Sequence, residues 1–200
     1  LGFELRRTLD LTAHEREGRF LEGTGSLVLD HVARRAYACR SPRTHEGLLR
    51  EWCSELGYEP VPFSAGDAAG RPWYHTNVML SIGSDFALVA AESIAGGDRD
   101  TVLGLLHGSG RTVVEIPRTA VAQFAGNVLE LAAWDEALGD LRVLAMSARA
   151  RDALDAQSFA RLSGAVDSVL VVPVPTIETV GGGSVRCMLA EVFRPGPRPR

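Results

Sequence analysis

A unit of about fifty residues recurs along this chain of 200 residues and constrains its fold more than any other feature. In the first copy, the pattern of apolar residues predicts strands at 26–30, 36–39 and 58–63, with an amphipathic helix at 45–56 before the third strand. Gly57 follows the last apolar residue of that helix and marks its end. The first copy is therefore interpreted as a strand–strand–helix–strand unit.

The same order of elements follows twice more and then begins a fourth time. The later elements are predicted as strands at 77–82, 86–94 and 111–116 with a helix at 99–106, strands at 127–131, 141–146 and 169–172 with a helix at 148–162, and a fourth leading strand at 184–190. This spacing indicates an α/β protein of about three and a half repeated ββαβ units. The alternative is an ordinary mixed α/β domain in which hairpins and helices alternate by chance.

Composition and charge exclude several classes of protein. Hydrophobic residues make up 46% of the chain and charged residues 23%, which is typical of a folded core rather than of disorder. The net charge of −4 argues against nucleic acid or an anionic membrane as the main partner. No apolar run approaches the ~18 residues of a membrane span, and the charged first residues are unlike a signal peptide. We therefore expect a cytoplasmic protein.

The three cysteines are an odd number and include no CxxC pair, so the sequence indicates neither a disulfide framework nor a zinc site. No other group of residues has convincing metal-ligand spacing. We expect a protein without a bound metal.

Four chemically distinct side chains lie at or just before the predicted leading strands. They are Glu22, His75, Asn127 and Cys187. Corresponding strand ends of repeated units converge if the units form a ring, so we expect these side chains to face one another. A carboxylate, an imidazole, an amide and a thiol in one cleft suit nucleophilic catalysis.

Cys187 is the most informative of the four. A thiol is a nucleophile only as thiolate, which needs an electropositive and partly open setting. The glycines at 181–183 allow close approach of the backbone, and Arg186 adds a positive charge. The alternative is a buried structural cysteine among apolar neighbours. Cys39 and Cys53 are predicted to be structural, one in a strand and the other on the apolar face of a helix.

The other candidate residues also have structural alternatives. His75 follows two aromatic residues that can exclude water and shift its pKa toward the working pH, but a lone histidine is often structural. Glu22 can equally be a turn acceptor, and Asn127 can bond a neighbouring backbone group. Arg43 has a guanidinium that suits a carboxylate, or it is a solvated surface charge.

Four segments, 21–30, 74–79, 124–127 and 181–188, together resemble the guanidino-group-modifying superfamily. This superfamily holds arginine deiminases, dimethylarginine hydrolases and amidinotransferases, and the chain is most similar to its arginine-deiminase-related branch, which includes citrulline hydrolases. The resemblance implies a pentein fold, in which five ββαβ units surround a pseudo-fivefold axis with the active site at the centre. The chain is then interpreted as one catalytic domain at 1–193 that lacks N-terminal units, with a flexible Pro/Arg tail at 194–200.

The resemblance also implies roles for individual residues. Cys187 matches the nucleophile, His75 the general acid and base, and Glu22 the carboxylate that holds the planar substrate group. Arg43 resembles the arginine that binds the substrate's α-carboxylate, and Asn127 matches a less certain substrate-binding position. The implied chemistry needs no cofactor: the thiolate attacks the central carbon of a guanidinium or ureido group, and water hydrolyses the covalent adduct.

Two departures from the family pattern bear on the substrate. Gly25 stands where deiminases and dimethylarginine hydrolases carry an aspartate, and Asn77, a third candidate for substrate binding, stands where an aspartate is also found. An unpaired guanidinium is costly to bury, so fewer carboxylates favour a neutral ureido group such as that of citrulline. Family members also carry further units upstream, so the chain resembles an N-terminally truncated member.

The sequence therefore predicts a hydrolase of a ureido or guanidino group, with citrulline converted to ornithine, ammonia and carbon dioxide. The expected partner is a small amino-acid substrate, and assembly into a homo-oligomer is left open. One alternative is an amidinotransferase, which passes the same adduct to an amine. Another is an inactive fragment or pseudoenzyme that keeps these residues without turnover.

Overall fold

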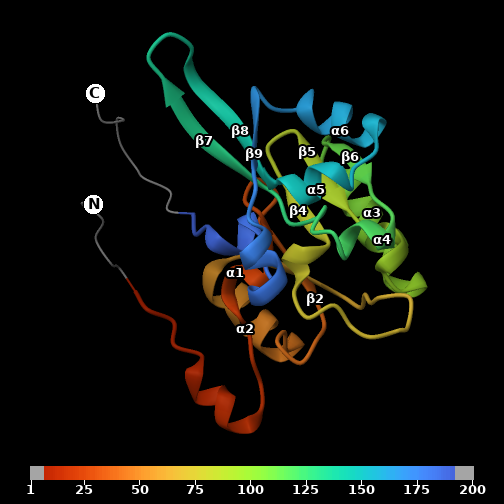
Figure 1. Cartoon of the computed structure of the whole chain (residues 1–200). Coiled ribbons are helices and arrows are strands. Elements are labelled where there is room, and N and C mark those ends of the chain that lie inside the picture. Colours follow the sequence, from red (N-terminus) through yellow and green to blue (C-terminus); the bar gives the residue numbers. More distant parts are fainter. Residues whose placement is uncertain (1–6, 192–200) are drawn as a thin grey trace.

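The computed structural model describes residues 7–191 and contains three separate three-stranded sheets, one from each repeat (Figure 1). In every sheet the first two strands are antiparallel and the third is parallel to the second. The parallel connection always passes through helix. Identical topology in three successive segments confirms the predicted ββαβ repeat. The predicted tail at 194–200 lies outside the described residues.

The first unit comprises β1 (Val28–Asp30), β2 (Arg35–Cys39), α2 (Glu46–Leu56) and β3 (Glu59–Phe63). Helix α2 begins where the side chain of His45 accepts a hydrogen bond from the Gly47 amide. It ends at Gly57, whose φ of 70° lies in the left-handed region that glycine adopts without steric cost. Local capping thus fixes both ends of the predicted helix.

The second unit comprises β4 (Leu80–Ile82), β5 (Phe86–Val89), α3 (Gly96–His107) and β6 (Thr112–Glu115). The predicted strand at 86–94 is too long, because the chain turns into a short 3-10 helix, η3 (Ala91–Ser93), after β5. Another helical turn, α4 (Arg118–Val121), leads from this unit into the third.

The third unit comprises β7 (Leu129–Asp135), β8 (Gly139–Ser147), α5 (Ala148–Asp152), α6 (Ala156–Ser163) and β9 (Ser168–Val172). The single helix predicted at 148–162 is wrong. The Asp155 carboxylate accepts from the amides of Gln157 and Ser158, so a new helix begins there. The β7–β8 hairpin is also longer than predicted and projects from the body of the protein (Figure 1).

The residues expected to start the leading strands instead form helical turns just before them. These turns are α1 (Gly23–Ser26) and η2 (Thr76–Val78), and β1 and β4 begin two residues after each. The chain at 124–127 likewise turns before β7, with the Asn127 amide donating to the carbonyl of Phe124. The polar residues of the motifs therefore lie on turns rather than within strands.

The predicted strand at 184–190 is wrong, because Val185–Met188 forms a 3-10 helix, η5. The Cys187 amide donates to the Ser184 carbonyl, which closes the turn. The Arg186 side chain is buried and donates to the carbonyl groups of Leu80 and Val128. These bonds hold the backbone in a turn and fasten it to the leading segments of the second and third units.

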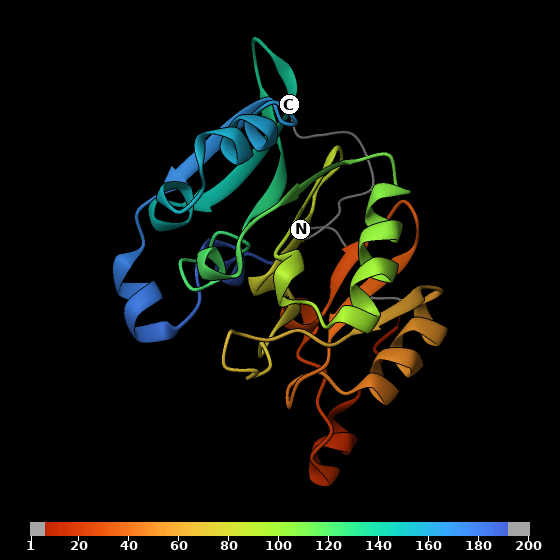
Figure 2. The ribbon, with the colours of Figure 1, turned by 90° about the vertical axis from the view of Figure 1, so that its right-hand side faces the viewer.

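The leading strands β1, β4 and β7 lie beside one another, whereas the helices α2, α3 and α6 lie toward the outside (Figure 2). The leading turns approach closely: a Cβ on Gly126 would lie 2.5 Å from the Val78 carbonyl oxygen, so this contact requires glycine. A buried ion pair joins the first two units. The Arg111 guanidinium donates hydrogen bonds to both carboxylate oxygens of Asp30, at 2.7 and 3.0 Å.

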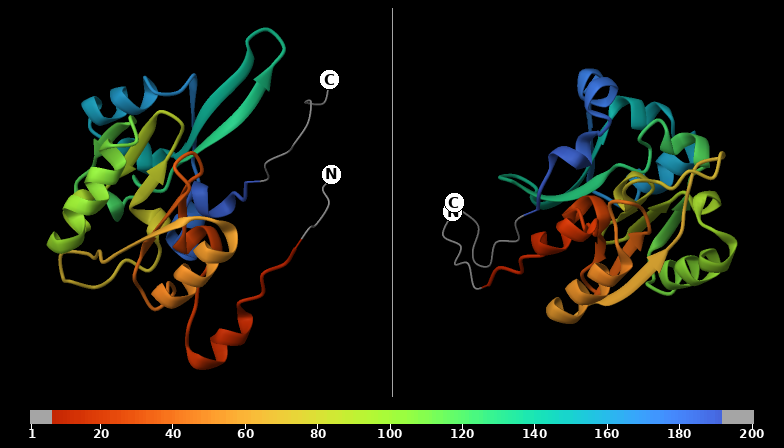
Figure 3. Two further views of the ribbon diagram at one scale, coloured as in Figure 1. Left: turned by 180° about the vertical axis from the view of Figure 1, so that it is seen from behind. Right: turned by 90° about the horizontal axis from the view of Figure 1, so that it is seen from below.

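Away from the sheets, the 3-10 helix η1 (Thr12–Glu17) extends from the body of the protein (Figure 3). Among residues 7–191, no helix combines the length and apolar character needed to cross a membrane.

Candidate functional site

The leading turns bring the predicted functional residues into two groups, one around Glu22 and His75 and one around Cys187 and Asn127. Glu22 precedes α1, His75 precedes η2, and Cys187 lies within η5. Turns α1 and η2 are in contact, and η5 is packed against the third unit. Residues distant in sequence thus meet because each repeat contributes the same kind of turn.

Glu22 and His75 form a hydrogen-bonded pair across the first two units. The Nε2 of His75 lies 2.7 Å from the Oε2 of Glu22. The His75 side chain is 15% exposed and that of Glu22 is 41% exposed, so the pair lies at the edge of solvent. Glu22 makes no capping hydrogen bond to α1. Its carboxylate therefore orients the imidazole rather than the turn that follows.

Arg43 lies next to the Glu22–His75 pair. Its Nη1 lies 3.5 Å from the same Glu22 oxygen, and its guanidinium lies 5.4 Å from the centre of the Tyr74 ring. The side chain is 53% exposed. Arg43 is therefore a surface charge, as one alternative predicted, and it also lies beside the candidate site.

Gly25 explains how the imidazole fits against α1. A Cβ at this position would lie 2.7 Å from two atoms of the His75 ring, which is closer than side chains approach. The ring therefore packs directly on the backbone of Gly25. The position at which the family pattern suggests an aspartate is filled here by the imidazole of His75.

Cys187 lies with its sulfur between two amide groups. The Nδ2 of Asn127 donates to Sγ at 3.2 Å, and the Nδ2 of Asn77 lies 3.9 Å from the same sulfur. Asn127 also donates to the Asn77 carbonyl oxygen at 3.1 Å. Cys187 itself is exposed. The sulfur is therefore both accessible and held by hydrogen-bond donors from two side-chain amides.

The oxygens of the same two amides have no partner. Asn77 Oδ1 and Asn127 Oδ1 are buried and accept no hydrogen bond within the described part of the chain. Buried acceptors without a donor are rare in folded proteins. Both unpartnered oxygens belong to the two side chains whose amide nitrogens lie at the Cys187 sulfur.

Tyr74 links the imidazole to the segment that carries the sulfur, and the sequence interpretation missed it except as an apolar neighbour of His75. Its Oη donates to the Gly182 carbonyl at 2.8 Å, and its ring centre lies 5.0 Å from that of His75. Burial raises the pKa of the Tyr74 hydroxyl, and the negative charge of the Cys187 thiolate adds to the rise. An aromatic residue directly before a candidate histidine was the available signal.

Of the two features expected around Cys187, the structure shows the close approach of the glycines but not a free charge on Arg186. The glycines do permit close approach, since a Cβ on Gly183 would lie 3.4 Å from the sulfur. Arg186, however, does not present a free charge to the thiol. Its guanidinium is held by Ser81 Oγ and by backbone carbonyls, and burial lowers its pKa to about 10.

The other two cysteines are unlike Cys187. Cys39 and Cys53 are buried, and burial raises the pKa of each thiol to about 11. Both therefore stay protonated near neutral pH, which agrees with the prediction that they are structural. No group of three histidine, cysteine or acidic side chains within residues 7–191 is arranged to hold a metal ion.

Comparison with known proteins gives a family and a fold. The family model described as N,N dimethylarginine dimethylhydrolase, eukaryotic, matches residues 1–194. No curated protein matches the chain.

Several solved structures share the fold at low sequence identity. The apo structure of ArgZ, an arginine dihydrolase from the ornithine–ammonia cycle in cyanobacteria, is 18% identical with a TM-score of 0.65, over 88% of this chain and 25% of that chain. AgrE in complex with ornithine and NAD+ is 17% identical with a TM-score of 0.65, over 89% and 23% of the two chains. SxtG, an amidinotransferase from Microseira wollei in the saxitoxin biosynthetic pathway, is 15% identical with a TM-score of 0.55, over 86% and 47%.

These likenesses confirm a pentein-type α/β fold, and residues 7–191 form three sheets that do not close into a ring. The chain spans about a quarter of the length of ArgZ and about half of that of SxtG.

Proposed function

Because the chain belongs to the N,N dimethylarginine dimethylhydrolase family, we propose that it hydrolyses a carbon–nitrogen bond in the guanidino or ureido group of an amino acid. The observation that carries the proposal is the environment of Cys187: an exposed sulfur that accepts from Asn127 and borders two side-chain amides whose oxygens have no partner among residues 7–191. Donors to a thiolate and acceptors for N–H groups in one place suit attack on a flat carbon that bears nitrogens.

The proposed reaction has two covalent steps. The Cys187 thiolate attacks the central carbon, and His75 gives a proton to the nitrogen that leaves. The resulting adduct joins Sγ to the former central carbon. Water, losing its proton to His75, then attacks that carbon and releases the thiolate. Glu22 keeps the imidazole oriented throughout, and the α-carboxylate of the substrate is assigned to Arg43.

Citrulline is the proposed substrate, because amides rather than carboxylates adjoin the sulfur. Asn77 and Asn127 are neutral, and the Glu22 carboxylate is already bonded to His75 and paired with Arg43. A cationic guanidinium would have no dedicated counter-charge beside the sulfur, which is costly in a partly buried site. With citrulline, ornithine leaves first, and hydrolysis of the S-carbamoyl adduct gives ammonia and carbon dioxide.

An N-methylated arginine is the second candidate, favoured by the family match. In that reaction the methylated amine leaves, and hydrolysis of the adduct yields citrulline. A transferase would instead pass the adduct to an amine.

The products separate these possibilities. The complete protein would be incubated with citrulline, arginine or dimethylarginine, and ornithine, ammonia, citrulline and methylamines measured. Ornithine and ammonia formed from citrulline support the proposal, whereas dimethylamine formed only from dimethylarginine supports the second candidate. A Cys187→Ala variant is the matched control, and Cys53→Ala tests a cysteine outside the site. If all three substrates remain unchanged, the proposed function is wrong.

A further inference from the structure

A cavity lies where the loop after β3 meets the beginning of α3. Its volume is about 620 Å³, and its walls are formed by the loop at 64–72, by η3 and by the starts of α3 and α4. Arg40, Arg99 and Arg118 line it, whereas none of the residues that surround Cys187 does. The cavity is therefore separate from the candidate site described above.

The first turn of α3 offers uncapped backbone donors to this cavity. The residue before the helix, Ala95, provides no side-chain cap. Among residues 7–191, the amides of Gly96 and Gly97 donate to no other group. The space in which either glycine would carry a Cβ is open. The N-terminus of a twelve-residue helix also carries partial positive charge, which favours an anion.

Single buried polar atoms at the same cavity lack partners as well. Ser93 is only 5% exposed and lines the cavity, yet its hydroxyl has no hydrogen-bond partner in the described part of the chain. The Nε atoms of Arg99 and Arg118 are buried and unpartnered too. Buried donors without acceptors cost free energy. All of these groups can donate, so together they match a ligand rich in acceptors.

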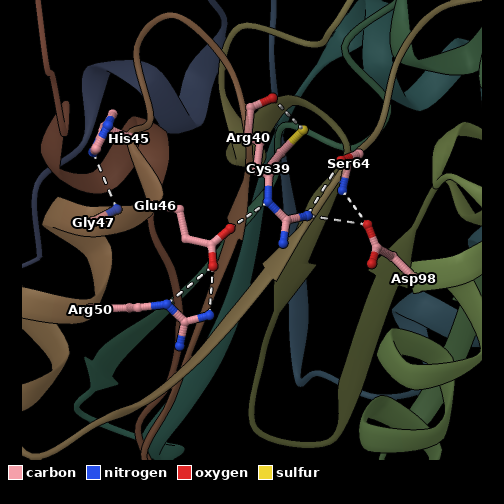
Figure 4. Close-up of polar contacts among 8 residues, drawn as sticks. All are labelled: Cys39, Arg40, His45, Glu46, Gly47, Arg50, Ser64 and Asp98. Carbon is pink, nitrogen blue, oxygen red and sulfur yellow. Dashed lines mark hydrogen bonds and ion pairs between the residues drawn. The ribbon is translucent and has the colours of Figure 1, made fainter.

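The charges of the three arginines differ in how they are balanced. Figure 4 shows the Arg40 guanidinium between the carboxylates of Glu46 and Asp98, at 2.6 and 3.2 Å. Arg99 and Arg118 instead donate to backbone carbonyls, both reaching that of Glu92. Neither lies within ion-pair distance of a carboxylate in the described residues. Two positive charges at the cavity are therefore uncompensated.

The two carboxylates that line the cavity are already engaged. Asp67 pairs with Arg71 at 2.7 Å and accepts from backbone amides. Glu92 accepts from the backbone amide of Arg118. These bonds leave the guanidinium groups of Arg99 and Arg118 as the free charges.

We propose that this cavity binds the phosphate group of a small molecule. Two guanidinium groups, the Gly96 amide at the helix N-terminus and a hydroxyl present donors from several directions, which suits the oxygens of a tetrahedral dianion better than the two oxygens of a carboxylate. The cavity has room for more than a bare phosphate, so the rest of the ligand extends along the loop at 64–72.

The test uses inorganic phosphate as the probe, titrated into the full chain at constant ionic strength and followed by calorimetry. One saturable site is expected. Gly97→Asp places a negative charge where it stabilises the helix but repels phosphate, so affinity is expected to fall at least about tenfold without loss of thermal stability. Gly104→Asp is the matched control, because it adds the same charge to an exposed position with open space on the same helix.

Two further variants test individual donors. Arg118→Gln is expected to weaken phosphate binding at least about tenfold. Ser93→Ala is expected to keep or raise the melting temperature without phosphate, because it removes an unpartnered hydroxyl, and yet to weaken phosphate binding. A purely structural role for Ser93 would not produce these opposite effects.

The proposal is overturned if phosphate does not bind saturably, or if Gly97→Asp and Arg118→Gln bind it as the unaltered chain does. It is also overturned if Gly104→Asp loses binding equally, since the effect would then be one of net charge. Acetate that binds as tightly as phosphate would assign the cavity to carboxylates instead.

Discussion

The side-chain amide of Asn127 donates a hydrogen bond to the Cys187 sulfur at 3.2 Å, although 60 positions separate the two residues. The same amide donates to the backbone of Asn77, which fixes its direction. A donor held in place by a second bond stabilises a thiolate more effectively than a mobile one. This contact relates the repeat architecture to reactivity, because it joins the leading turn of the third repeat to η5, which lies beyond that repeat in the chain.

Asn127→Asp is expected to slow the alkylation of the Cys187 thiol by iodoacetamide near neutral pH. The substitution replaces a donor with a negative charge next to the sulfur, which disfavours the thiolate. The rate would be measured against pH by mass spectrometry of the modified peptide. Gln123→Ala, on the exposed surface nearby, serves as the control and should leave the profile unchanged. An unaltered profile in Asn127→Asp would remove this residue from thiolate stabilisation.

Gly25→Ala is expected to lower the turnover rate strongly while it changes the thermal stability of the protein little. The added Cβ would lie 2.7 Å from the His75 ring, so the imidazole must move away from its place beside Glu22. A misplacement of about 1 Å in catalytic geometry can cost about a hundredfold in rate. Steady-state kinetics and thermal unfolding would be compared with those of Gly104→Ala, where the added methyl group meets open space. Normal kinetics in Gly25→Ala would show that His75 needs no fixed position.

Asn77→Asp is expected to shift substrate preference toward cationic guanidinium compounds. The amide nitrogen of Asn77 lies 3.9 Å from the Cys187 sulfur, so a carboxylate at the same position can pair with a guanidinium held beside the sulfur. The measurement is the ratio of kcat/KM for arginine to that for citrulline in the variant and the parent. If the ratio stays constant or moves toward citrulline, the charge argument for a ureido substrate fails.

The buried thiol of Cys39 is expected to make the fold less stable at alkaline pH. Its pKa is raised by burial from 9.0 to about 11, so the unfolded chain loses this proton at lower pH than the folded chain does. The contribution to stability is complete below pH 9 and declines as the pH rises from 9 to about 11. The Cys39 thiol lowers the free energy of unfolding by about 1.4 kcal/mol per pH unit in that window.

Chemical denaturation at several pH values would compare Cys39→Ala with Cys187→Ala. The first variant should show a shallower alkaline decline, whereas the second, at an exposed position, should retain the parent slope. Identical slopes in all three proteins would contradict the assignment of this decline to Cys39.

The repeat and its order of elements could be predicted from the sequence, because the apolar periodicity and the glycine at the end of α2 are local signals. The break between α5 and α6 depends on the Asp155 cap, which the apolar pattern at 148–162 does not reveal. The turn at Val185–Met188 could not be predicted in the same way. It is fixed by the Arg186 side chain reaching the carbonyls of Leu80 and Val128, which are more than fifty positions away.

The candidate site was predictable in its members but not in its contacts. Motif order placed Glu22, His75, Asn127 and Cys187 in one region, and the structure pairs the first two and the last two separately. The function of Gly25 as a platform for the imidazole emerges only in three dimensions, since spacing alone shows a glycine where an acid is expected. Tyr74 was missed because its bond to Gly182 spans 108 positions.

The most direct test of the central claim is the mass of the peptide that contains Cys187, isolated after turnover of citrulline is quenched with acid. The account predicts an added carbamoyl group on that cysteine, and neither adduct nor turnover in Cys187→Ala. Turnover that persists in Cys187→Ala, or an adduct on another residue, would contradict it.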